Sequence, residues 1–314
     1  MTSERPRALF FGTPEIAVAA LEALVGVCDV PLVICQPDKP VGREQRVEPP
    51  PVKRRAVELG LSVHQPVKVR VPEFAALLRE QRADVAVVFA YGRILTAEVL
   101  RAPRLGCVNL HASLLPKYRG AAPINWAIAR GEVETGVCLM QMDEGLDTGP
   151  VLTRRAVPIG PDETAPELSR RLAALGAEMV RDELPRLLRG ELSPTPQDDA
   201  HATFAPILTR AHGRVDWSRP AKEVHDLVRA MTPWPGAHTS LRDRTLKLQT
   251  TRVTAGDGPP GTVLRADKGG VFVACGAGAV ELVTAQLEGR KALAGRELAA
   301  GRALAVGDVL GAPA

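Results

Sequence analysis

Short apolar segments alternate with amphipathic segments through the first half of the chain, and this alternation constrains the fold more than any other feature. The apolar segments have the length of buried strands and occupy residues 7–12, 30–36, 83–92, 106–112 and 135–142. Amphipathic segments lie between them, and a longer one at residues 164–190 has apolar side chains at helical spacing. Such alternation predicts an α/β fold, with a mostly parallel sheet covered by helices on both faces.

The pattern changes after residue 190. Residues 191–205 are rich in Pro, Asp and Thr and have little periodicity, which predicts a linker. Beyond it, one helical segment at residues 221–231 precedes several short strand-like runs separated by turns, as in a small β-barrel or sandwich. We therefore expect an α/β domain at residues 1–190, the linker, and a small β domain at residues 206–314.

The positive charge of the chain is concentrated in its last third. Residues 206–314 hold 15 basic and 10 acidic side chains, whereas residues 1–205 hold 25 and 26. A basic module that follows a neutral one suggests a polyanionic partner for the C-terminal part. A basic surface that only keeps the protein in solution explains the charge equally well.

The cysteines and the N-terminus indicate the cellular compartment. The five cysteines are scattered and form no CxxC pair, so they predict neither a disulfide framework nor a zinc cluster and fit a reducing environment. No apolar run approaches membrane-spanning length, and the charged N-terminus leads directly into a short strand, unlike a signal peptide. We therefore expect a cytoplasmic protein that uses no membrane and no metal.

A polar pair stands at the end of one predicted strand, in the sequence NLHASLLPKYRGAAP. Asn109 and His111 are two residues apart, so on a strand their side chains project from the same face. Ligands of open α/β sheets gather at the carboxyl ends of the strands. An internal hydrogen-bonded pair is the alternative, but the irregular loop that follows favours a functional site.

A third polar candidate follows the next predicted strand, in the sequence MDEGLDTGP. Because neighbouring strand ends can face one crevice, we expect Asp147 to reach His111, although a surface turn would have the same composition. An amide and a protonated imidazole can donate to an oxygen that becomes negative during acyl transfer. A carboxylate can help to move a proton from the attacking group to the leaving group. This chemistry needs neither a metal nor a covalent nucleophile.

These residues and their surroundings resemble the methionyl-tRNA formyltransferase family. The matching motifs are Gly12-Thr13-Pro14-Glu15, the Asn-x-His-x-Ser-Leu-Leu-Pro of residues 109–116, the GLDTG of residues 145–149 and the PWPG of residues 233–236. The likeness runs over nearly the whole chain. It implies a Rossmann-like formyltransferase domain followed by a small OB-like barrel. It also implies transfer of a formyl group from 10-formyltetrahydrofolate to the α-amine of methionyl initiator tRNA, giving formylmethionyl-tRNA for translation initiation.

The resemblance also assigns site residues by position. The catalytic trio of the family falls on Asn109, His111 and Asp147. The folate contacts of the family fall on Ser113, Leu114, Leu115, Pro116, Phe89, Ala90 and Tyr91.

In this family an inserted loop after the second strand enters the acceptor end of the tRNA. Arg43 matches the arginine that the family uses there, and Arg46 and Lys53 keep the segment basic. Glu44 and Gln45 depart from the glycine and lysine common in the family. The implied partners are therefore initiator methionyl-tRNA and folate, with no stable protein partner.

Several other functions remain open at this point. Another folate-dependent formyltransferase, acting on a nucleotide or an amino sugar, or a formyl hydrolase would share the trio. A hydrolase with a covalent nucleophile would use Cys107 or Ser113, both near His111 in the sequence. A non-catalytic RNA-binding module would explain the basic C-terminal part but would leave the trio without a role.

Overall fold

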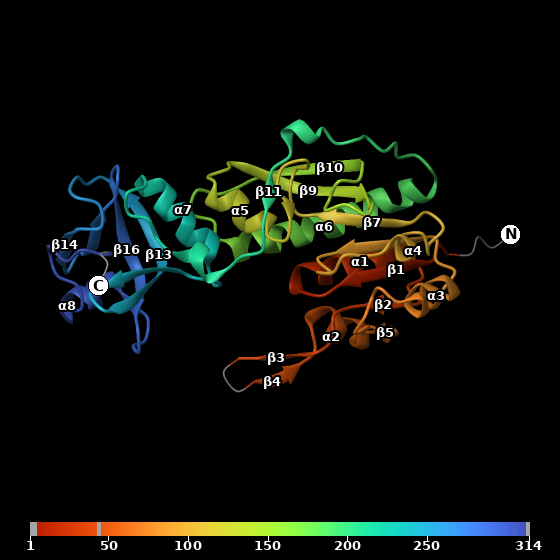
Figure 1. The fold of residues 1–314 in the computed structure, drawn as a ribbon, viewed down its shortest axis with the longest axis horizontal. Helices are drawn as coiled ribbons and strands as arrows, with labels where there is room; N and C mark the ends of the chain where they lie inside the picture. Colours follow the sequence, from red (N-terminus) through yellow and green to blue (C-terminus); the bar gives the residue numbers. More distant parts are fainter. Residues whose placement is uncertain (1–4, 43–44, 312–314) are drawn as a thin grey trace. The chain divides into compact units, whose positions relative to one another are not determined.

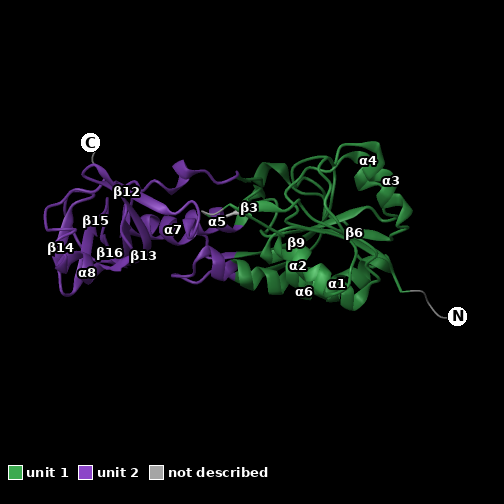
Figure 2. Cartoon of the chain, turned by 90° about the horizontal axis from the view of Figure 1, so that it is seen from below, with its two compact units in different colours: residues 1–123, 135–157, 169–205 green, residues 124–134, 158–168, 206–314 purple. Residues whose placement is uncertain are grey.

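The computed structural model describes residues 5–42 and 45–311. The chain divides into two compact units, coloured separately in Figure 2. The first unit consists of residues 1–123, 135–157 and 169–205, and the second consists of residues 124–134, 158–168 and 206–314. Within the described residues, no helix combines the length and the apolar character needed to cross a membrane.

A seven-stranded sheet forms the centre of the first unit (Figure 1). Its strands are β1 (Ala8–Gly12), β2 (Val33–Ile34), β5 (Val63–His64), β6 (Val85–Phe89), β7 (Cys107–His111), β9 (Glu134–Gln141) and β10 (Val151–Pro158). They lie in the order β10-β9-β7-β6-β1-β2-β5. The pairs β1–β2, β1–β6, β2–β5 and β6–β7 are parallel, whereas β7–β9 is antiparallel. The predicted mostly parallel, Rossmann-like sheet is confirmed.

Helices cover both faces of this sheet. They are η1 (Glu15–Ala17), α1 (Val18–Val27), α2 (Pro51–Glu58), α3 (Pro72–Glu80), α4 (Ala97–Leu100) and α6 (Ala165–Leu188). Proline opens α2 and α3, where its missing N–H would have no helical partner in any case. Side chains of α3 and α4, among them Phe74 and Val99, pack on one face of the sheet with Leu9 and Cys107. On the other face, Gly176 of α6 brings that helix against the strands.

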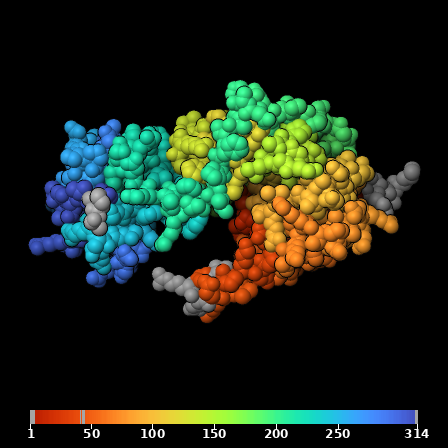
Figure 3. All heavy atoms as spheres, in the orientation of Figure 1, coloured from red at the N-terminus to blue at the C-terminus, as the bar shows by residue number. Residues whose placement is uncertain are grey.

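The segment between β2 and α2, where the family resemblance implies an inserted loop, contains a β-hairpin. β3 (Lys39–Val41) and β4 (Arg46–Glu48) pair antiparallel, with Lys39 opposite Glu48. Gly42 follows β3 and Gln45 precedes β4, and both have positive φ. Each strand has only three residues, and prolines surround the pair. The sequence here therefore shows no alternation of apolar and polar residues that would predict strands. The hairpin projects from the first unit beyond α2 (Figures 1 and 3).

Residues 191–205, where the sequence predicts a linker, run along the first unit. They include the short helix η2 (Asp199–His201) and the strand β11 (Phe204–Ala205). β11 pairs in parallel with β8 (Arg119–Gly120), which follows the Asn-x-His motif. This pairing holds the segment against the loop that carries the candidate site.

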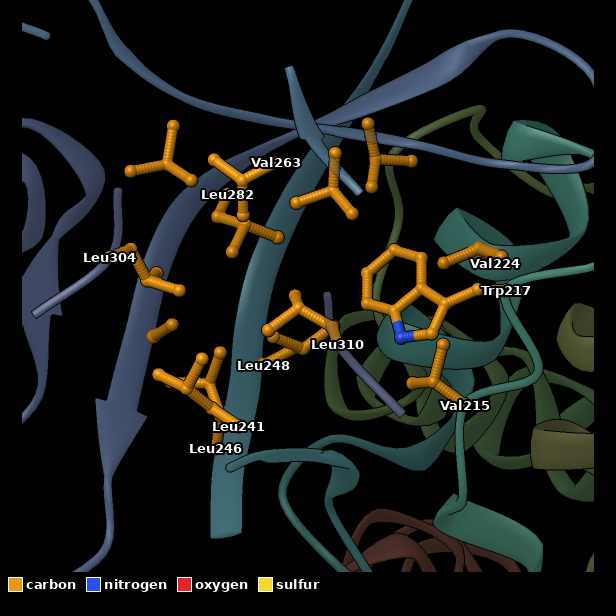
Figure 4. Packing of buried hydrophobic residues seen from close by; sticks show 14 of the residues in the cluster. Val215, Trp217, Val224, Leu241, Leu246, Leu248, Val263, Leu282, Leu304 and Leu310 are labelled. Carbon is orange, nitrogen blue, oxygen red and sulfur yellow. The ribbon is translucent and has the colours of Figure 1, made fainter. Parts of the chain in front are cut away.

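The second unit contains an antiparallel sheet in the order β12-β13-β16-β15-β14, with β17 beside β16. The strands are β12 (Ala237–Leu241), β13 (Arg244–Thr254), β14 (Val263–Asp267), β15 (Gly270–Ala274), β16 (Ala279–Leu287) and β17 (Leu293–Ala294). The helices are α5 (Pro123–Ala129), η3 (Arg210–Gly213), α7 (Ala221–Met231) and α8 (Gly295–Ala300). Leu310 bridges to Leu241 and Val309 to Thr262, so the chain end joins the two edges of the sheet. This closure, around a core that includes Trp217 (Figure 4), confirms a small OB-like barrel.

Candidate active site

Asn109 and His111 lie at the carboxyl end of β7, on the same face of the sheet. Leu110 points to the opposite face, where it lies close to Gly176 of α6. Asn109 is 9% exposed and His111 is 5% exposed. The alternation expected for a strand therefore places an amide and an imidazole side by side, almost out of reach of bulk water.

Both ring nitrogens of His111 face oxygen atoms. Nε2 lies 2.8 Å from the carbonyl oxygen of Tyr118, and Nδ1 lies 3.6 Å from Oδ2 of Asp147. A carbonyl oxygen can only accept a hydrogen bond, so Nε2 carries a hydrogen and donates it. Nδ1 is therefore the nitrogen left for chemistry, and 3.6 Å to the carboxylate is longer than a direct hydrogen bond.

Asp147 reaches His111 by a different path from the one expected. Because β9 runs antiparallel to β7, its last residue, Gln141, lies beside Val108 and not beside His111. The connection between β9 and β10 instead brings Asp147 to the imidazole. The backbone N–H of Gly120 donates to Oδ2 of Asp147 at 2.8 Å and orients the carboxylate.

Three residues around the site have left-handed backbone conformations. Tyr118, Asp147 and Ala90 have φ values of 63°, 53° and 51°. For residues other than glycine this conformation costs on the order of 1–3 kcal/mol each, and it persists only where the surroundings hold it. Two of the three, Tyr118 and Asp147, supply the oxygen atoms that face His111. Strained backbone is thus found at both residues that position the imidazole.

The Asn109 side chain has no hydrogen-bonding partner within the part of the chain that the structure describes. Its amide is not fully enclosed, because the enclosed side-chain polar atoms without a partner among the described residues are the Tyr91 hydroxyl and the Thr135 hydroxyl. Its N–H groups can therefore donate to a ligand without first breaking a bond within the protein.

Residues 113–116, which follow β7, include both buried and partly accessible side chains. The hydroxyl of Ser113 is buried and donates to the carbonyl of Lys117 at 2.6 Å. Leu115 is buried against Cys138 and Met140. Leu114 and Pro116 are half-buried, so within Ser113–Pro116 these two offer the accessible side chains.

The end of β6 shows a similar division. Phe89 and Tyr91 are buried, whereas Ala90 between them is exposed. The Tyr91 ring packs edge-on against Phe11, and burial raises the pKa of its hydroxyl to about 12. The carbonyl oxygen of Tyr91 accepts hydrogen bonds from Thr13 and Gln36, which fix the backbone at this strand end.

Neither candidate covalent nucleophile is placed to react. Cys107 is 1% exposed, its Sγ lies 3.9 Å from the carbonyl oxygen of Val99, and burial raises the pKa of its thiol to about 12. A neutral, enclosed thiol is inert. The hydroxyl of Ser113 is committed to the Lys117 carbonyl. The geometry therefore favours a mechanism without a covalent intermediate.

Of the residues predicted for tRNA binding, Arg46 and Lys53 lie on or near the hairpin. Arg43 and Glu44 lie outside the described residues. Arg46 is exposed on β4. Lys53 of α2 donates from Nζ to both carboxylate oxygens of Asp38, at 2.9 and 2.7 Å, and to the amide oxygen of Gln65 at 2.8 Å. These bonds hold the chain where it enters the hairpin.

Four residues that the sequence did not suggest also belong to the site. They are Tyr118, Gly120, Gln197 and Thr203. Gln197 lies 50 positions from Asp147 along the chain, and its amide nitrogen donates to the Asp147 carbonyl. Contacts of this separation leave no spacing pattern in a sequence. Among the described residues, no group of three or more His, Cys, Asp or Glu side chains is arranged to hold a metal ion.

Comparison with protein families gives two consecutive matches. A family described as formyl transferase matches residues 7–184, and the formyl transferase C-terminal domain matches residues 207–303. The chain is 57% identical to a methionyl-tRNA formyltransferase of Sorangium cellulosum, covering 92% of this chain and 94% of that protein. It is 50% identical to the methionyl-tRNA formyltransferase of Myxococcus xanthus, with 92% and 93% covered.

Solved structures with the same fold are more distant in sequence. WlaRD, a sugar 3N-formyl transferase crystallised with dTDP and 5-N-formyl-THF, has a TM-score of 0.67 at 17% identity, with 92% of this chain and 100% of that chain covered. HypX from Aquifex aeolicus in complex with tetrahydrofolic acid has a TM-score of 0.62 at 20% identity. That match covers 94% of this chain, which spans about half (47%) of the HypX chain. At these identities the likeness shows the fold alone.

Proposed function

The chain belongs to the methionyl-tRNA formyltransferases of the formyl transferase family, and we propose that it takes the formyl group from 10-formyltetrahydrofolate and transfers it to the α-amine of methionyl initiator tRNA. The product is formylmethionyl-tRNA, which starts translation. The observation that carries the mechanism is the setting of His111, with Nε2 bonded to the Tyr118 carbonyl and Nδ1 facing Asp147.

The residues at the two strand ends fit a folate donor. The unpaired amide of Asn109 supplies a donor for a carbonyl oxygen, and exposed Ala90 leaves the backbone at the end of β6 within reach of a flat heterocycle. Leu114 and Pro116 offer apolar surface nearby along the chain. When bound, the folate supplies an amide-linked formyl group whose carbon can be attacked by an amine.

In the proposed transfer, the neutral α-amine of the methionyl group attacks the formyl carbon, and the formyl oxygen takes up the electron pair of the broken π bond. The Asn109 amide and the Nδ1–H of protonated His111 donate to this oxygen as it becomes negative. Asp147 accepts the proton that the amine must lose. The bond to the folate nitrogen then breaks, and that nitrogen receives a proton in return.

The Tyr118 carbonyl gives the imidazole its direction. Because it binds the Nε2 hydrogen, it keeps the ring from rotating and leaves Nδ1 pointed at Asp147. Nδ1 and the carboxylate are 3.6 Å apart, which is longer than a direct hydrogen bond. Each group can therefore bind the reacting atoms. Catalytic hydrogen bonds are commonly long before the substrate binds.

Basic residues of both units support the tRNA assignment. Arg43 and Arg46 are proposed to contact the acceptor end of the tRNA, and the basic excess of residues 206–314 is proposed to bind the tRNA backbone. Binding through phosphates weakens as the salt concentration rises. We place the protein in the cytoplasm, where charged initiator tRNA and folate are both present.

The test offers the purified protein 10-formyltetrahydrofolate with methionyl initiator tRNA, methionyl elongator tRNA and a nucleotide-linked amino sugar, each in a separate reaction. We expect rapid formylation of the initiator tRNA and slow formylation of the other two. Formylation of the amino sugar alone would favour a sugar formyltransferase. Release of formate without transfer would favour a formyl hydrolase.

A further inference from the structure

We infer that the segment from Gln197 to Ala205 is part of the catalytic machinery, and that Gln197 and Thr203 are positioning residues for Asp147 and His111. The inference rests on the proposed function for its kinetic readout. Its structural basis is that one segment binds both of the strained residues whose oxygen atoms face the imidazole.

Gln197 holds the backbone on both sides of Thr148. Its Nε2 donates to the carbonyl of Asp147 at 2.8 Å and to the carbonyl of Gly149 at 2.7 Å. Gln197 is half-buried, whereas every other residue from 193 to 200 is exposed. The two bonds fasten the residue whose φ of 53° places its carboxylate toward His111.

The opposite end of the Gln197 amide is also bonded. Its Oε1 accepts from Nε and Nη2 of Arg119, at 3.1 and 2.9 Å, and Arg119 is 4% exposed. Nη2 of Arg119 also donates to Asp199 at 2.7 Å, which supplies a counter-charge for the buried guanidinium. Turning the amide over would set oxygen against carbonyl oxygens and NH₂ against the guanidinium, so its orientation is determined by its partners.

Thr203 holds the other strained residue. Its Oγ1 accepts from the backbone N–H of Tyr118 at 2.9 Å, and its carbonyl accepts from the backbone N–H of Arg119 at 2.9 Å. Tyr118 in turn presents its carbonyl to Nε2 of His111. The hydroxyl of Thr203 therefore acts on the direction of the imidazole through a single residue, Tyr118.

These contacts converge on the distance between His111 and Asp147. If either bond is lost, a left-handed residue is free to relax, and the carboxylate or the imidazole moves relative to the other. Misplacement of catalytic groups by about 1 Å can slow a reaction about 100-fold without a comparable loss of substrate binding. The expected sign of a positioning role is thus a fall in kcat with little change in KM.

The experiment compares Gln197→Ala with Gln141→Ala, a control in the same unit. Nε2 of Gln141 also donates to two carbonyls, those of Leu105 and Cys107, but these lie at the opposite end of β7 from His111. We expect Gln197→Ala to lower kcat by about 10- to 100-fold with KM for both substrates little changed, and Gln141→Ala to keep the wild-type kcat. An equal fall in both variants, or none in Gln197→Ala, would overturn the inference.

A second pair of variants tests Thr203. Thr203→Ser retains the hydroxyl acceptor, whereas Thr203→Val retains the shape and removes the acceptor. We expect Thr203→Ser to keep most of the wild-type kcat and Thr203→Val to lose about 10-fold or more. Equal rates for the serine and valine variants would contradict the role of the hydroxyl.

A spectroscopic readout separates this inference from the proposed function. The imidazole ¹⁵N shifts of His111 should move in Gln197→Ala and Thr203→Val and stay in place in Gln141→Ala, whatever substrate the enzyme uses. Unmoved shifts would overturn the positioning role even if formyl transfer is confirmed. Moved shifts in a protein that formylates no tRNA would support it and reject the proposed substrate.

Discussion

Nε2 of His111 donates to the backbone carbonyl oxygen of Tyr118 across 2.8 Å. The acceptor is a main-chain atom of a residue with a φ of 63°, so the direction of the imidazole depends on the backbone conformation of Tyr118. Substitution of the Tyr118 side chain alone would therefore leave this hydrogen bond in place. The consequences of the arrangement can be measured directly.

The first prediction concerns the tautomer of His111. Because the Tyr118 carbonyl can only accept, neutral His111 should carry its hydrogen on Nε2 and leave Nδ1 unprotonated. The measurement is a long-range ¹H–¹⁵N spectrum of ¹⁵N-histidine-labelled protein, with His111→Ala to assign the signals. A neutral ring protonated on Nδ1 would contradict the arrangement and the role given to that nitrogen.

The second prediction concerns the trio itself. His111→Ala and Asp147→Asn should each lower kcat by roughly 10²- to 10⁴-fold, since each removes a proton-handling group. Asn109→Ala should lower it by roughly 10²- to 10³-fold through loss of one donor to the developing negative oxygen. Cys107→Ala, on the same face of β7, is the matched control and should turn over near the wild-type rate. Comparable losses in the cysteine variant would point to a general defect of the strand.

The side-chain parity of β7 was accessible from the sequence. Two-residue spacing placed Asn109 and His111 on one face, and the structure has Leu110 on the other face beside Gly176. The alternation of apolar and amphipathic segments likewise predicted the sheet and its helices, because burial on both faces leaves a strong periodic signal. Local patterns of this kind need no knowledge of distant contacts.

The approach of Asp147 to His111 could not be derived correctly in the same way. The sequence indicates a strand before Asp147 but not its direction, and β9 is antiparallel to β7. The role of Gln197 was equally hidden, because a half-buried glutamine in an aperiodic segment resembles the exposed residues around it. Both depend on pairings between segments far apart in the chain, which local propensity does not encode.

The third prediction is a pH dependence of stability. Burial raises the pKa of the Cys107 thiol to about 12, whereas a thiol in an unfolded chain ionises near pH ~8.5. The stability that this thiol contributes is therefore full below that lower value and is lost as pH rises toward the higher one. Under reducing conditions, the Tm of the wild type should fall more steeply than that of Cys107→Ala above pH ~8.5. If the Tm of the wild type and of Cys107→Ala fell equally with pH, the raised pKa of this thiol would be contradicted.

The fourth prediction concerns Lys53. All three of its ammonium hydrogens are accounted for by bonds to Asp38 and Gln65, so we expect it to act on tRNA by holding the hairpin. Lys53→Ala and Asp38→Ala should then both raise KM for tRNA several-fold and leave KM for the folate unchanged. If Lys53 contacts a phosphate directly, Asp38→Ala would release the ammonium and lower KM for tRNA. Steady-state kinetics with each substrate varied in turn separate the two outcomes.

The fifth prediction compares two glycines with positive φ in the first unit. Gly120 has a φ of +119°, and a Cβ there would lie 2.8 Å from the carbonyl oxygen of Ala205, so Gly120→Ala should push β8 away from β11. Its N–H, which orients the Asp147 carboxylate, would move with it, and kcat should fall by about 10- to 100-fold.

The control is Gly190, which has a φ of +75° with nothing within 4 Å of the added Cβ. Gly190→Ala should therefore lose about 1–2 kcal/mol of unfolding free energy, from the left-handed conformation alone, and keep its kcat. Denaturant unfolding and initial rates measured on both variants make the comparison, and equal kcat values would show that the Gly120 N–H does not hold Asp147 for the reaction.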